Sequence, residues 1–99
     1  MDKHGYPEMR ELNTVSNWRA EDGYVELMTY LKDIWNYADV GYWSETRIGD
    51  YLRCEISTGG WSGNEDLVRA LQKNTMFWMM CWYMSKRGGH YEFRVRKGT

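Results

Sequence analysis

The stretch from Leu52 to Val95 constrains the fold of this chain more than any other part of the sequence. Apolar and polar residues alternate at both of its ends, which is typical of strands with one buried face. Between these ends lie two glycine-rich turns, a short amphipathic segment and a long apolar run. We therefore expect strands near 51–57, 76–86 and 90–97, and a short helix over 64–73.

The apolar run from Met76 to Met84 admits two interpretations. Both of its faces are apolar, which suits a central strand that is covered on both sides. A buried helix is the alternative, because periodicity does not separate the two structures in such a run. The aromatic content of the run and the Gly-Gly turn at 87–90 favour the strand.

The helix over 64–73 acts as a crossover between the strands near 51–57 and 76–86. If these two strands pair, they run parallel and the sheet is mixed. The loops that follow them then lie at the same edge of the sheet, where ligands of open sheets bind. We therefore predict a ligand-binding site made of Thr58, Gly59, Gly60, Trp61, Ser62, Arg87, Gly88, Gly89 and His90.

The residue types at this candidate site suit a small anionic ligand. Backbone amides at a helix N-terminus attract anions, and Ser62 and Glu65 match a capping box at that terminus. Arg87 suits a phosphate or carboxylate, and Trp61 suits stacking on a ring. The glycines match neither the P-loop nor the dinucleotide-binding spacing, so turns beside a helix cap are the alternative interpretation.

The first half of the chain supplies the main helix. Apolar residues recur at helical spacing between Tyr24 and Ala38, so we expect a helix over 22–38 that covers the sheet. Residues 1–20 read as a less regular N-terminal arm. With no internal repeat or linker, residues 1–99 are expected to form a single domain.

A strand near 43–48 is expected to pair with the strand near 51–57. A three-residue loop would set Ile48 beside Leu52, in agreement with the hydrophobic pattern, and we prefer that register to a two-residue loop. The predicted fold class is therefore α+β, with three or four strands packed by the main helix.

Aromatic residues are unusually frequent, with six tryptophans and eight tyrosines among 99 residues. This exceeds what one small core needs, so some should be exposed. Exposed Trp and Tyr are enriched at binding hot spots, and we name Tyr42 and Trp43 as candidate interaction residues.

The cysteines and the hydropathy pattern indicate the environment in which the protein is found. Cys54 and Cys81 lack metal-ligand spacing, so we expect buried thiols, no metal and no cofactor. No apolar run reaches about 18 residues, so no membrane span is expected. Without a signal-peptide pattern, we expect a cytoplasmic protein.

Charge is distributed unevenly along the chain. Residues 1–50 hold ten acidic and five basic residues, whereas residues 51–99 hold four acidic and eight basic ones. Basic residues interleaved with aromatics near 86–97 are compatible with single-stranded nucleic acid. The net charge of −1 and the pI of about 6.1 argue against this partner.

No motif in the sequence identifies a catalytic centre, and we name no catalytic residue. His90 is a possible acid or base, but it needs a nucleophile or a carboxylate beside it. Ser57, Thr58 and Ser62 lie near it without the strand–turn–helix serine motif of hydrolases. Whether the protein is an enzyme is left open, with a non-enzymatic role preferred.

The segment from Ile56 to Glu65, ISTGGWSGNE, and the later segment RGGHYEF from Arg87 to Phe93 resemble small proteins encoded by tailed bacteriophages. The resemblance covers roughly the C-terminal half. It implies a protein made in the cytoplasm of an infected bacterium, and small accessory phage proteins often bind a host component. It carries no activity over to any residue.

These observations favour a non-catalytic binding protein that acts through protein–protein contact with a host component. The alternative is a small protein, possibly an enzyme, that binds an anion or nucleotide between the two glycine-rich loops. A single-stranded nucleic-acid binder is the third hypothesis.

Overall fold

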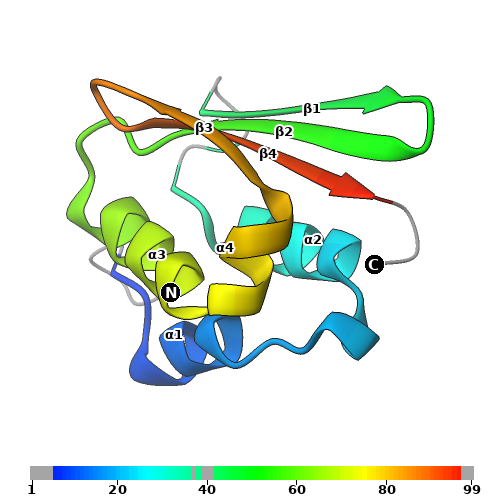
Figure 1. Ribbon diagram of the computed structural model, residues 1–99. Coiled ribbons are helices and arrows are strands. Elements are labelled where there is room, and N and C mark those ends of the chain that lie inside the picture. The colour runs from blue at the N-terminus through cyan, green and yellow to red at the C-terminus, as the bar shows by residue number, and fades with distance from the viewer. Residues whose placement is uncertain (1–5, 37, 39–41, 97–99) are drawn as a thin grey trace.

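The computed structural model describes residues 6–36, 38 and 42–96, and it confirms the α+β class. Helices lie on one side of a four-stranded sheet (Figure 1). In chain order the elements are α1 (Met9–Ser16), the 3-10 turn η1 (Ala20–Asp22), α2 (Tyr24–Ile34), β1 (Trp43–Ile48), β2 (Tyr51–Ser57), α3 (Ser62–Lys73), α4 (Thr75–Cys81), β3 (Trp82–Lys86) and β4 (His90–Arg96).

The sheet is antiparallel throughout, with strand order β1-β2-β4-β3. The predicted mixed sheet is therefore wrong. Strands β2 and β3 do run in the same direction, but β4 lies between them and pairs with both. The tight turn at 87–89 sends the chain straight back beside β3, so that β4 fills the position next to β2.

Residues Thr75–Cys81 form helix α4, so the predicted strand over 76–86 is wrong in its first half. Phe77 and Cys81 lie one helical turn apart and both are buried. The Asn74 side chain caps the helix by accepting a hydrogen bond from the Phe77 amide at 3.2 Å. The buried-helix alternative thus describes α4, and only β3 is a strand.

The β1–β2 hairpin has a two-residue loop, Gly49-Asp50, with Ile48 opposite Tyr51. The preferred three-residue register is wrong. The reason is Trp43, which pairs with Ile56 and is buried against the helices. A shift of one residue would turn Trp43 to the opposite side of the sheet, because strand side chains alternate between faces.

Helix α2 ends at Ile34, four residues before the predicted end at 38. Trp35 takes an extended conformation, and its indole Nε1 donates to the Ser57 carbonyl at 3.1 Å. A tertiary contact with the end of β2 thus accompanies the end of the helix. The prediction for residue 37 lies outside the described residues.

The N-terminal arm, which was predicted to be less regular, contains helix α1, and this helix packs against α3. Glu8 and Glu11 form a reciprocal capping box at its start. Trp18 then donates to the Gly23 carbonyl at 2.8 Å and lies against Tyr30. The described part of the arm, residues 6–20, is therefore an integral part of the helical layer.

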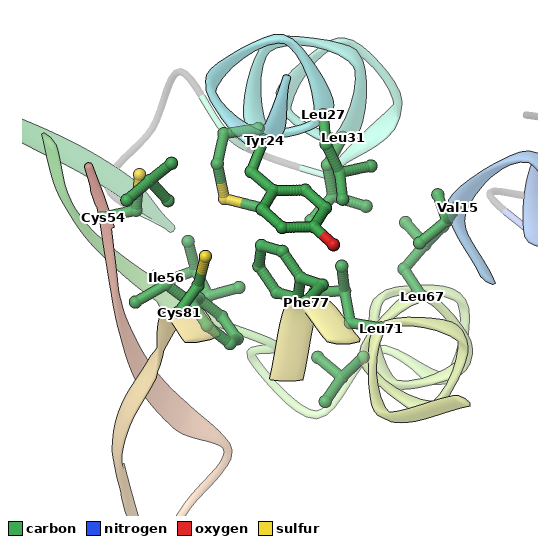
Figure 2. Close-up of a cluster of buried hydrophobic side chains, with 14 of the residues drawn as sticks. Val15, Tyr24, Leu27, Leu31, Cys54, Ile56, Leu67, Leu71, Phe77 and Cys81 are labelled. Atoms are coloured by element: carbon green, nitrogen blue, oxygen red, sulfur yellow. The ribbon is translucent and has the colours of Figure 1, made fainter. Parts of the chain in front are cut away.

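The core lies between the helices and the inner face of the sheet. Figure 2 shows the rings of Tyr24 and Phe77 at its centre, where they meet edge to face with centroids 5.2 Å apart. Side chains from all four helices and from β2 surround them. The labelled members are Val15, Leu27, Leu31, Cys54, Ile56, Leu67, Leu71 and Cys81.

The opposite side of the sheet, which we call the outer face, carries no helix within the described part of the chain (Figure 1). Alternation along the paired strands assigns its residues. They are Ser44, Thr46, Ile48, Tyr51, Arg53, Glu55, Ser57, Met84, Lys86, His90, Glu92, Arg94 and Arg96.

Candidate functional site

The two glycine-rich loops meet at one end of the sheet, as their positions in the sequence predict. The Thr58 amide donates to the Gly89 carbonyl at 2.9 Å, and Ser57 pairs with His90 across β2 and β4. Contact between the loops therefore arises because β4 begins beside the end of β2. The expected parallel pairing is not needed for it.

Part of the predicted site is structural. Thr58 is buried, and its carbonyl accepts from the Trp61 amide and from the Asn64 side chain. A Cβ atom at Gly59 would overlap the Tyr42 ring, and one at Gly89 would overlap Thr58 Oγ1. Thr58 therefore joins the two loops and is itself hidden from solvent, whereas Gly59 is exposed and Gly89 is half-buried.

Asn64 organises this end of the sheet, and the sequence analysis missed it as a tertiary anchor. It is fully buried, and its side chain accepts from the Asn36 amide at 2.8 Å. The same side chain donates to the carbonyls of Asn36 at 3.2 Å and Thr58 at 3.3 Å. One amide thus connects the end of α2, the loop after β2 and the start of α3.

The remaining predicted residues lie at the surface: Gly60, Trp61, Ser62, Arg87, Gly88 and His90. Trp61 is 43% exposed and occupies the N-cap position of α3. The predicted capping box is wrong, because the helix begins at Ser62 and its N-cap position has no side-chain cap.

A groove of about 410 Å³ lies on the outer face beside these loops. Its only predicted site residue is His90, whose Nδ1 lies 2.6 Å from Ser57 Oγ. The groove is lined by Ser44, Glu55, Ile56, Ser57, Met84, Lys86, His90, Tyr91 and Glu92. All of these are strand residues, and alternation places all but Ile56 and Tyr91 on the outer face once the strand order is known.

An ion cluster adjoins the groove along the middle of the outer face. Glu92 is only 6% exposed and accepts from Arg94 Nε at 2.7 Å, while Arg53 Nε lies 3.5 Å from it. The hydrogen bond to Glu92 raises the pKa of Arg94. The Arg94 guanidinium also lies 3.5 Å from the ring centroid of Tyr83 and 5.4 Å from that of Tyr51.

A second surface feature lies where α4 continues into β3. We call it the methionine patch, and it consists of Met76, Met79, Met80 and Trp82. Their exposed fractions are 54%, 80%, 49% and 42%. The three methionines share one side of α4, because positions three and four apart in a helix are neighbours.

The predicted interaction residues do not form such a surface. Trp43 is buried, meets Trp35 edge to face, and donates through Nε1 to Glu45 at 2.6 Å. Tyr42 is partly buried against the core and lies over Gly59. The prediction that Trp43 is exposed is therefore wrong, and the exposed aromatics among the described residues are Tyr6, Trp61, Trp82 and Tyr83.

A scan against protein-family models, a search of curated proteins and a search of solved structures each find no match to this chain. The described residues contain no helix that is long and apolar enough to cross a membrane. They also contain no group of three or more His, Cys, Asp or Glu residues placed to hold a metal ion.

Proposed function

We propose that the protein is a non-catalytic binding protein and that its methionine patch holds a segment of another protein. The supporting observation is the exposure of four large apolar side chains within residues 76–82. The same helix turns Phe77 and Cys81 into the core. The three methionines therefore lie on the solvent side of a helix that is anchored in the core, and Trp82 follows them at the start of β3.

The residue types in the patch suit protein recognition. Methionine side chains are flexible and polarisable, so they adapt to a partner's apolar surface. Tryptophan is enriched among residues that dominate binding energy. Adjacent exposed apolar side chains of this kind mark interaction sites more often than inert surface.

The charges beside the patch define the chemistry of the partner. Met80 lines a pocket of about 260 Å³ together with Tyr51, Arg94 and Arg96. An apolar segment that covers Met80 would thus bring its flanking residues to two arginines. We propose a partner segment with apolar anchors followed by carboxylates, which complement the arginines. The resemblance to bacteriophage proteins favours a protein of a bacterial host cytoplasm.

Site-specific photocrosslinking tests this function. A benzophenone side chain replaces Met79 in one variant and Thr29, an exposed residue of α2, in a control. We expect one discrete bacterial protein to form an adduct at position 79 and not at position 29. The purified partner should then bind about tenfold more weakly to the Met76→Ser/Met80→Ser variant, because buried apolar contact is lost.

The adduct must depend on the patch to support the proposal. A captured protein that crosslinks equally at positions 29 and 79, or that binds the serine variant as tightly as the wild type, contradicts it. A chain-to-chain adduct as the sole product also contradicts it, because the patch would then be a self-association surface.

A further inference from the structure

We propose that the outer face of the sheet binds single-stranded nucleic acid along β4. Four cationic side chains lie on this face, and the acidic side chains opposing them are Glu55 and Glu92. Glu92 is buried and held by two of the arginines. Glu55 and Glu92 together offset two of the four cations, Arg53, Lys86, Arg94 and Arg96, so this face keeps a net positive charge.

The opposite side of the molecule has the reverse charge. Residues 6–36, which form α1, η1 and α2, hold six acidic and three basic residues. The imbalance along the sequence thus becomes an imbalance between two faces, with the sheet on one side and these helices on the other (Figure 1). A net charge of −1 conceals a surface that attracts phosphates.

Aromatic rings lie among these cations. Tyr83 is 47% exposed, and Arg94 covers one side of its ring at 3.5 Å from the centroid. A nucleic-acid base can extend this stack on the exposed ring surface, as in sheets that bind single strands. Tyr51 lies on the other side of Arg94, so the cation is flanked by rings from neighbouring elements.

The dimensions of the outer face fit more than one nucleotide. The span from His90 to Arg96 is about 20 Å, at roughly 3.3 Å per residue. The groove of about 410 Å³ lies at its start, with Lys86, Ser57 and His90 as groups that can bind phosphate or sugar oxygens. Arg96 lies at the other end, beside the pocket of about 260 Å³.

Fluorescence anisotropy with a labelled 12-nucleotide oligothymidylate tests the inference. With about three phosphate contacts, the logarithm of affinity should fall with a slope of about −2 against the logarithm of salt. Affinity should thus drop roughly twentyfold between 50 and 200 mM NaCl. Lys86→Gln/Arg96→Gln should make that slope shallower by about 1.4, because two contacts are lost.

A matched control removes the same charge from the helical side. Arg69→Gln/Lys73→Gln changes two exposed residues of α3 and should leave the salt slope unchanged. Tyr83→Leu keeps the side chain apolar but removes stacking, and it should weaken binding roughly tenfold. If the outer-face double variant loses its far-UV circular dichroism, Lys86→Gln alone gives the comparison.

Several results would overturn the inference. These are no binding at 50 mM NaCl, equal losses in the two double variants, or unchanged binding in Tyr83→Leu. Competition by polyglutamate as strong as by unlabelled oligothymidylate would identify a general polyanion surface. Competition by thymidine monophosphate at the same concentration would identify a small-anion site in the groove alone.

Discussion

Single residues decide how closely the two loops approach each other. Gly88 and Gly89 both have positive φ, at 89° and 80°, which disfavours any residue with a Cβ atom. Of the two, only Gly89 also lacks room for a side chain, because a Cβ atom there would overlap Thr58 Oγ1. At Gly88 the nearest atoms would be those of the His90 ring at 3.5 Å.

These two glycines provide a matched pair of substitutions. Gly88→Ala should lower the free energy of unfolding by about 1–2 kcal/mol through backbone strain alone. Gly89→Ala should lower it by a further 1–3 kcal/mol or so, because the methyl group must separate the loops. Urea denaturation measures both. Equal losses would show that Thr58 and Gly89 are not in tight contact.

Buried asparagines carry contacts between distant parts of the chain. Asn74 caps α4 and also donates to the carbonyls of Val15 at 3.0 Å and Trp18 at 2.9 Å. Near the other end of α3, Asn64 likewise hydrogen-bonds to backbone groups of Asn36 and Thr58. Nothing in the residue type distinguishes a buried asparagine from a loop asparagine, so these roles emerge only from the fold.

At the scale of elements, α4 links the core to the exposed surface. One side of this seven-residue helix supplies Phe77, which contacts both Tyr24 and Phe93. The other side supplies most of the methionine patch. Such a short helix is unstable by itself, so its core side must hold it in place.

Substitutions on the two sides of α4 should therefore differ sharply. Phe77→Ala should lower the free energy of unfolding by about 3–5 kcal/mol, because it leaves a cavity in the core. Met79→Ala, at a position that is 80% exposed, should change it by less than about 0.5 kcal/mol. Chemical denaturation of both variants measures this. A large loss at position 79 would indicate that the methionine is buried in the free protein.

At the scale of the whole molecule, the core encloses ionisable groups in their neutral form. Burial raises the pKa of the Cys54 thiol to about 12 and that of the Cys81 thiol to about 12. Burial also raises the pKa of Tyr24. In the unfolded chain thiols titrate near about 8.5, so the folded state holds these protons more tightly at alkaline pH.

Stability should consequently fall on the alkaline side. The contribution of the neutral thiols is complete below about pH 8.5 and is lost as the pH rises toward 12. The urea midpoint of the wild-type protein should drop across this range. Cys54→Ala/Cys81→Ala should show a smaller drop from a lower starting stability. Thiols that react with a disulfide reagent at pH 8 as fast as free cysteine would contradict this burial.

The accuracy of the sequence predictions depended on how local each feature is. The strands near 51–57 and 90–97, the short helix after the first glycine loop and the meeting of the loops are all present in the structure. Alternation, the apolar stripe of the short helix and the glycine turns indicate these elements directly, because each pattern depends on a few adjacent residues. The loop contact survived a wrong sheet topology, since β4 follows immediately after its turn.

The predictions were wrong where they required knowing which side of a helix or strand is buried. That depends on residues that lie far away in the sequence. Periodicity did not separate helix from strand over 75–81, and the hairpin register depended on whether Trp43 faces the helices. The prediction that Trp43 is exposed was wrong for the same reason, because exposure depends on what covers a side chain.

The sequence by itself determined the α+β fold class, the apolar and polar alternation within β2 and within β4, and the positions of the glycine turns. These features follow from local backbone preferences. Only the tertiary structure decided that β4 lies between β2 and β3, that α4 exposes its methionines and that charge separates onto two faces. Strand order and exposure are properties of neighbours far apart in the chain, and they are set when the apolar side chains of all the elements share one core.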